Sequence, residues 1–107
     1  MGEGLISINR SVAAPGANTD ILATDLTPSG NVVAFGISVQ LETASVFNVM
    51  ETIGGTTRDV APLKNAALVA GALYEFAISV DQAATYNFQV ETDSVIDRLY
   101  VSMLTDG

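Results

Sequence analysis

The chain has 107 residues, no cysteine and no histidine, and a formal net charge of −8 at neutral pH. Disulfides, thiolate catalysis, cysteine or histidine zinc sites and every nucleophile that depends on a histidine base are therefore excluded. Its basic residues are few and scattered, which argues against nucleic acid as a partner: Arg10, Arg58, Lys64 and Arg98. The acidity also disfavours anionic membranes, and no apolar run approaches the roughly 20 residues of a membrane helix.

Residues 1–18 are predicted to form an extended N-terminal arm or an edge strand. Leu5 to Val12 alternates weakly, with one cation interrupting the apolar phase, and Pro15-Gly16 then breaks the pattern. No secretory signal is visible, because Met1 to Gly4 carries no positive charge and leads into no long apolar stretch. Residues 19–107 contain no repeat and no linker, so we expect one domain there, made and used without export.

Two strands are predicted between Thr19 and Leu41. Thr19 to Leu26 is interpreted as a short strand, and Pro28-Ser29-Gly30 as the turn that follows it, since Pro presets φ and Gly accepts a positive φ. Val33 to Leu41 alternates cleanly between large apolar and small residues, which predicts a strand with one buried face. Its opposite face is small or polar: Ala34, Gly36, Ser38 and Gln40.

The next strand is predicted at residues 44–53. Its faces carry different side chains, with Phe47 and Val49 on one and Val46 and Met50 on the other. A Gly-Gly turn follows, and Arg58–Val60 is predicted to begin a short strand. Residues 62–72 leave two alternatives open. They form about one helical turn, or a loop that tucks Leu63 and Leu68 under the sandwich.

The clearest pattern lies between Leu73 and Glu91. Leu73–Val80 and Thr85–Glu91 both place large apolar or aromatic residues at even positions, and the break between them is short. We therefore predict an antiparallel hairpin whose even residues share one buried face: Tyr74, Phe76, Ile78 and Val80 with Tyr86, Phe88 and Val90. Its register sets Val80 opposite Ala84 or Tyr86, because paired residues point to the same face. The same spacing indicates core aromatics, not a platform for sugars.

The last predicted strand runs from Val95 to Leu104, with one apolar face: Val95, Leu99, Val101 and Met103. The chain thus contains seven to nine short strands spaced about ten residues apart, without a long helical pattern. This arrangement predicts an all-β fold, namely an antiparallel β-sandwich that is jelly-roll-like.

Carboxylates are the remaining candidates for chemistry. Asp20 with Asp25, or Asp93 with Asp97, could form an acid–base pair, but aspartates at turns and strand ends typically cap backbone groups. Glu91, Asp93 and Asp97 form the densest acidic group, and oxygen ligands of this kind can hold Ca²⁺, although their spacing matches no EF-hand. We therefore predict no catalytic residue, no cofactor and no metal, with these last three acids as the weak metal candidates.

Two segments resemble small virion proteins. Asn65 to Phe76 is an Ala/Gly-rich lead-in to Leu-Tyr-x-Phe, and Thr85 to Val90 contains Tyr-Asn-Phe-x-Val. Short β-sandwich and jelly-roll proteins of tailed phages and related archaeal viruses carry similar segments, and the stretch from Thr19 to Gly30 is also similar. The resemblance spans residues 19–104 and contains no diagnostic motif, so no functional residue carries over. It implies a capsid-associated, decoration or tail protein acting as a symmetric homo-oligomer, with a trimer favoured over a dimer.

The leading functional hypothesis is a non-enzymatic structural protein of a virus particle, made in the host cytoplasm and assembling with its own copies and other virion proteins. The apolar content of 49% agrees, since surplus apolar surface often lies in an interface. The predicted contacts are the residues left over after the core faces are assigned: Ile6, Ile8, Val12, Ala34, Gly36, Ser38, Val46 and Met50. Two alternatives stay open, namely a surface- or carbohydrate-binding module and a filament subunit that donates its N-terminal strand.

Overall fold

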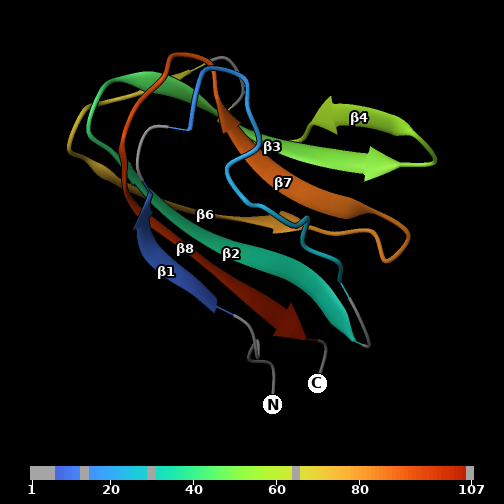
Figure 1. Cartoon of the computed structure of the whole chain (residues 1–107). Coiled ribbons are helices and arrows are strands. Elements are labelled where there is room, and N and C mark those ends of the chain that lie inside the picture. Colours follow the sequence, from blue (N-terminus) through green and yellow to red (C-terminus); the bar gives the residue numbers. More distant parts are fainter. Residues whose placement is uncertain (1–6, 13–14, 29–30, 64–65, 106–107) are drawn as a thin grey trace.

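The computed structural model describes residues 7–12, 15–28, 31–63 and 66–105, and within them the only regular elements are strands (Figure 1). The strands are β1 (Ser7–Val12), β2 (Val32–Leu41), β3 (Ser45–Ile53), β4 (Thr56–Asp59), β5 (Ala67–Leu68), β6 (Leu73–Ser79), β7 (Thr85–Val90) and β8 (Ile96–Thr105). Their pairings are all antiparallel. The predicted all-β antiparallel sandwich is therefore confirmed.

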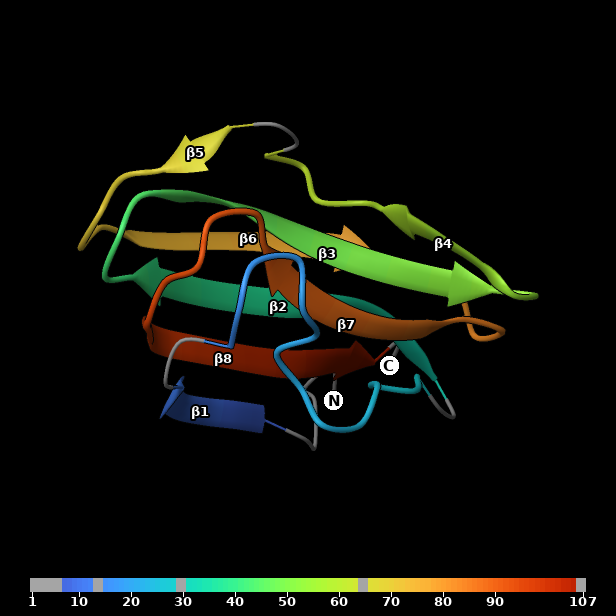
Figure 2. The same cartoon turned by 45° about the horizontal axis from the view of Figure 1, so that its top comes forward.

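Two sheets face each other across the core (Figure 2). The first has the strand order β1-β8-β2-β6. In the second, β3 is central, with β7 along one side and β4 and β5 along the other. Aromatic rings connect the layers: Phe35 on β2 meets Tyr86 on β7 edge to face, with ring centroids 5.2 Å apart. Phe47 on β3 meets Phe76 on β6 at 6.4 Å.

The strand pairs are nested along the chain: strands near its start pair with strands near its end, and the pairs between them lie closer together in the sequence. From the chain ends inwards, β1 pairs with β8, residues 18–26 bond to β7, β2 pairs with β6, and β3 pairs with β4 and β5. Two further pairings, β2 with β8 and β3 with β7, join these pairs into the two sheets. This nesting is the strand order of a jelly roll.

The predicted hairpin between residues 73–80 and 84–91 is wrong. β6 pairs with β2 in the first sheet, whereas β7 pairs with β3 in the second, so the short turn between them crosses from one layer to the other. That turn is closed by the Ala84 N–H, which donates to the Asp81 carbonyl at 3.0 Å. Phe76 and Phe88 both face the core, and they approach it from opposite sheets. Alternation identifies the buried face of a strand, but it does not identify the partner strand.

Residues 19–26, predicted to be a strand, form an irregular segment along the outer edge of β7. Backbone N–H groups of Asn18, Ile21 and Leu26 donate to carbonyls of β7 at 2.7–2.8 Å, and only Leu26 makes a β-bridge, with Tyr86. Asn18 pairs with Val90 and Leu26 with Tyr86, so eight steps of the segment cover four steps of the strand. The surplus chain has to bulge outwards, and a regular ladder is impossible.

The remaining elements lie near their predicted positions. In residues 62–72 the loop alternative is confirmed for the described part, with Leu68 buried, Leu63 half-buried against the core and β5 as the added short strand. β1 lies at the edge of the first sheet, where Ile8 pairs with Val101 and Val12 with Ile96.

The two core phenylalanines should differ in energetic weight. Phe88 is fully buried and stacks on Phe47 at 5.7 Å, whereas Phe76 is only half-buried at the first sheet's β6 edge. We expect Phe88→Ala to cost about 3–5 kcal/mol of unfolding free energy, through lost transfer energy and the cavity left behind. Phe76→Ala should cost clearly less. Urea unfolding of both variants checks this, and equal losses would contradict the assigned burial.

Candidate functional site

Asn87 lies at the centre of a buried polar contact between β7 and residues 18–26. Its Oδ1 accepts the N–H groups of Leu22 at 3.0 Å and of Phe88 at 2.8 Å. Its Nδ2 donates to the Leu22 carbonyl at 3.0 Å and to Asp25 Oδ1 at 2.7 Å. Because Leu22 is buried, the side-chain amide of Asn87 takes the place of a strand partner for both of its backbone groups. This set of contacts is called the Asn87 clamp below.

The aspartates predicted as one possible acid–base pair flank the Asn87 clamp. Asp20 Oδ1 accepts a hydrogen bond from Gln89 Nε2 at 2.8 Å. Asp25 accepts from Asn87 and, through Oδ2, from the Thr85 hydroxyl at 3.2 Å. Each carboxylate thus binds different side chains of β7, and the structure does not bring the two together. Their geometry holds the segment onto the sheet.

The acidic group predicted as the weak metal candidate is spread over separate contacts. Asp93 Oδ1 accepts the Gly16 N–H at 2.8 Å, and Glu91 Oε2 accepts from Asn48 Nδ2 at 3.2 Å. Asp97 is exposed on β8. Within residues 7–12, 15–28, 31–63 and 66–105, no three acidic side chains are grouped so that they could hold a metal ion. The Asp93 carboxylate, like Asp20 and Asp25, fixes the segment that precedes β2. In the second possible acid–base pair, Asp93 is bonded to the Gly16 backbone and Asp97 is exposed on β8.

Tyr86 and Glu51 form a buried acid–phenol pair at one end of the core. They are directly opposite each other on β7 and β3, and the Tyr86 hydroxyl donates to Glu51 Oε2 at 2.6 Å. Burial, and then the hydrogen bond to Glu51, raises the pKa of Tyr86 to about 12. The Asp81 N–H donates to the same hydroxyl at 2.8 Å, and Arg58 Nε donates to Glu51 Oε1 at 3.1 Å from the surface. The pair therefore ties both the turn before β7 and β4 to the core.

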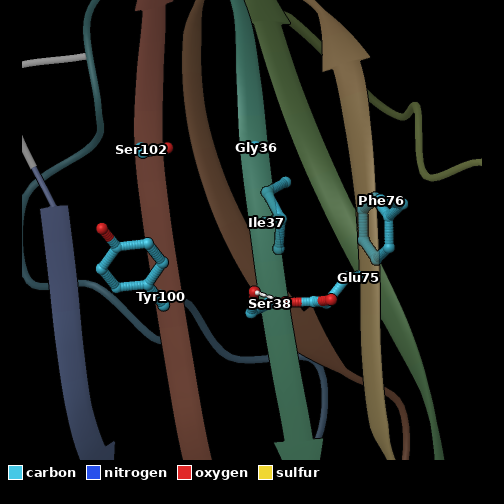
Figure 3. Close-up of a pocket in the computed structure, with 7 residues that line it drawn as sticks. All are labelled: Gly36, Ile37, Ser38, Glu75, Phe76, Tyr100 and Ser102. Carbon is cyan, nitrogen blue, oxygen red and sulfur yellow. Dashed lines mark hydrogen bonds between the residues drawn. The ribbon is translucent and has the colours of Figure 1, made fainter. Parts of the chain in front are cut away.

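A shallow depression lies on the outer face of the first sheet and has a volume of about 360 Å³. It is lined by Gly36, Ile37, Ser38, Glu75, Phe76, Tyr100 and Ser102 (Figure 3). The Ser38 hydroxyl donates to Glu75 Oε2 at 3.1 Å across the gap between β2 and β6. This arrangement can offer hydroxyls, a carboxylate and an aromatic side chain to a polar ligand.

Gly36 forms part of the floor of this depression, and the fold does not require glycine there. A Cβ at Gly36 would lie 3.5 Å from Ser102 Oγ and 3.9 Å from Leu104 Cδ1, which are ordinary contacts. Glycine inside a strand weakens it and often marks a place where another chain or a ligand approaches closely. Of the small face predicted at Ala34, Gly36 and Ser38, the first two residues are half-buried, and Ser38 is buried.

The other predicted contact residues lie elsewhere. Val46 and Met50 are half-buried on the outer face of the second sheet, which is the opposite side of the sandwich from Gly36. Ile8 and Val12 belong to β1 at the edge of the first sheet, and Ile6 lies outside the described residues. The structure therefore does not gather the predicted contacts into one patch.

Two polar residues that matter for the fold were missed at the sequence level. Asn87 occupies an odd position of its strand, outside the apolar alternation that marks the core face. Glu51 is in phase with Phe47 and Val49, so the alternation itself places its carboxylate towards the core. A charged residue in an apolar phase needs a partner, and this signal could have pointed to Tyr86 or Arg58.

Comparisons with protein-family models, curated proteins and solved structures found no match to this chain. In the part of the chain that the structure describes, no helix has the length and apolar character needed to cross a membrane.

Removing the Asn87 clamp should free the segment along β7. We expect Asn87→Ala to cost more than about 2 kcal/mol, because the buried N–H and carbonyl of Leu22 lose their partner. Gln89→Ala, which removes only the exposed bond to Asp20, is the matched control and should cost below about 1 kcal/mol. Urea unfolding gives the two free energies, and faster proteolysis within residues 16–26 should accompany the first variant alone. Similar losses for both variants would count against the clamp.

Stability should fall at high pH because of Tyr86. Its pKa in the folded protein, about 12, lies above the ordinary value of 10.0, so the unfolded chain loses this proton first as pH rises. The contribution is complete below pH 10 and decreases by about 1.4 kcal/mol per pH unit until the folded-state pKa is reached. Urea unfolding at pH 8 and pH 11 measures the loss. Tyr86→Phe should be less stable at pH 8 and should lack this part of the pH dependence; an unchanged slope would refute the assignment.

Proposed function

We propose that the protein is a non-enzymatic structural protein of a virus particle, of the capsid-associated, decoration or tail type. It acts by assembling with its own copies and with other virion proteins, after synthesis in the host cytoplasm. The observation that carries the proposal is the jelly-roll strand order, since capsid proteins are among the protein classes built on this nesting. The support is an analogy of fold, to which the resemblance of residues 65–76 and 85–90 adds.

The use of the polar side chains supports the same proposal. Asp20, Asp25 and Asp93 hold the segment before β2 against the second sheet, and Glu51 holds the core end of β7. These carboxylates serve the fold through defined hydrogen bonds. The outer face of the first sheet, by contrast, has a shallow depression at Gly36, and a glycine inside a strand suits close approach by another chain.

A surface- or carbohydrate-binding module is the second candidate, and the depression around Gly36 favours it. Lectin domains also use the jelly roll. Tyr100 supplies an aromatic side chain, and Ser38, Ser102 and Glu75 supply hydrogen-bonding groups around an open floor (Figure 3). The filament alternative would exchange β1, which already lies at a sheet edge, for the same strand of a neighbour.

The mass of the full chain in solution tests the proposal most directly. We expect sedimentation to give a multiple of the monomer mass at high micromolar concentration, and portal, terminase or tail genes to lie beside the coding gene. A monomer at every concentration would overturn intrinsic self-assembly. Saturable binding of a sugar that is lost in Tyr100→Ala, together with a monomeric mass, would favour the binding module instead.

A further inference from the structure

The outer edge of β6 is the sheet edge that the fold leaves least protected among the described strands. Residues 18–26 bond to the edge of β7, and β4 with β5 covers the other side of β3. β1 carries a register shift between Arg10 and Val12, and such an irregularity is a known protection of an edge. β6 has seven residues, no proline and no register shift against β2. Such a long, regular edge is a template for another strand.

Alternation of the ladder identifies which backbone groups of β6 are free to pair. The Val80 N–H donates to the Val33 carbonyl at 3.1 Å, continuing the register in which Ser79 pairs with Ala34. In an antiparallel ladder every second residue bonds to a given neighbour, so the even residues of β6 bond to β2. The outward N–H and carbonyl groups belong to the odd residues: Leu73, Glu75, Ala77 and Ser79.

The one charge on β6 is turned away from this edge. Glu75 reaches back over β2, where its Oε2 accepts the Ser38 hydroxyl at 3.1 Å (Figure 3). A charged side chain that projected outwards from the edge would oppose the approach of another strand. Held by Ser38, the Glu75 carboxylate leaves the edge accessible.

Exposed apolar side chains lie at both ends of β6. The large hydrophobic residues that the structure describes as exposed are Val33, Val69 and Leu73, with 47%, 62% and 47% of their surface accessible. Leu73 begins β6 and Val69 lies shortly before it, whereas Val33 bonds to Val80 just after its end. An antiparallel partner of the same sequence brings the Leu73 end of one copy against the Val33 end of the other.

We propose that β6 pairs antiparallel with β6 of a second copy of this chain about a two-fold axis, which rests on the self-assembly in the proposed function. Overlap of the whole strand centres the axis on Phe76, so Leu73 lies opposite Ser79 and Glu75 opposite Ala77 of the partner. In this register every odd residue of one β6 lies opposite an odd residue of the other, so their outward N–H and carbonyl groups can hydrogen-bond to each other. The two Glu75 carboxylates are not directly opposed. The two first sheets become one continuous sheet.

Cysteine cross-linking tests this register, because the natural chain has no cysteine. Full chains carrying Glu75→Cys are mixed with full chains carrying Ala77→Cys and oxidised mildly. Residues opposite each other in a bonded antiparallel pair have Cα atoms about 5.5 Å apart, within disulfide range. With the two chains in equal amounts, random pairing yields twice as much mixed dimer as either self-linked product. We expect the mixed cross-linked dimer to exceed that ratio clearly, and mixtures with Thr56→Cys on β4 to show no such excess. A mixed product at or below twice the yield of each self-linked product would overturn the register.

A charge placed on the edge provides the second test. Ala77 is exposed, so Ala77→Lys should fold normally and reduce the mass from dimer to monomer by blocking the edge. Thr56→Lys adds the same charge to the exposed start of β4 and should remain dimeric. A two-fold contact yields even-numbered assemblies, so a trimer, or an oligomer unchanged by Ala77→Lys, would overturn the pairing and leave self-assembly standing. A wild-type chain that is monomeric would overturn both the β6 pairing and the proposed self-assembly.

Discussion

The second sheet depends on one buried side-chain amide, that of Asn87, which forms the backbone hydrogen bonds of an irregular segment along its edge. Residues 18–26 are too long for the four steps of β7 that they cover, so they cannot exchange hydrogen bonds in register. Asn87 resolves this conflict, because an amide side chain has both donors and acceptor positions and can bond the N–H and the carbonyl of Leu22 at once. The edge of β7 is therefore covered without a regular strand, and Ile21 and Leu22 can be buried over it.

A second buried polar contact starts from Tyr86, the neighbour of Asn87 on β7. Glu51 would be costly inside the sandwich, but it accepts hydrogen bonds from the Tyr86 hydroxyl and from Arg58 at the surface. Tyr86 in turn packs its ring on Phe35 and accepts the Asp81 N–H, so one residue links β2, β3 and the turn before β7. The two polar contacts are made by adjacent residues near the start of β7, and Phe88, the residue that follows them, stacks on Phe47.

Local alternation predicted the positions of strands and most of their buried faces. It did not predict which strands pair, because pairing depends on the path of the chain between them. The strands 33–41, 44–53 and 95–104 were predicted closely, because most inward positions of β2, β3 and β8 are apolar. The predicted face of the last strand is wrong at its start, where a register shift against β2 buries Ile96 and leaves Val95 half-buried. The partner of Leu73–Ser79 was not predicted, because a short turn can either close a hairpin within one sheet or cross to the other sheet. For the candidate site, small side chains indicated the face around Ala34 and Gly36. Glu75 and Tyr100 come from other strands, and no pattern within one strand could place them beside it.

The nested strand order has a consequence for how the chain reaches its fold during synthesis. Of the described strands, β1 is made before all the others and its partner β8 after them, so the first sheet cannot close until β8 is available. Pairings between such distant residues make folding slow, because the entropy of closing the chain is lost before the contacts form. A ribosome adds roughly 5–20 residues per second, so β1 and the early strands stay unpaired for seconds. The apolar side chains of the early strands are then exposed to non-native contacts, so aggregation is favoured during this interval.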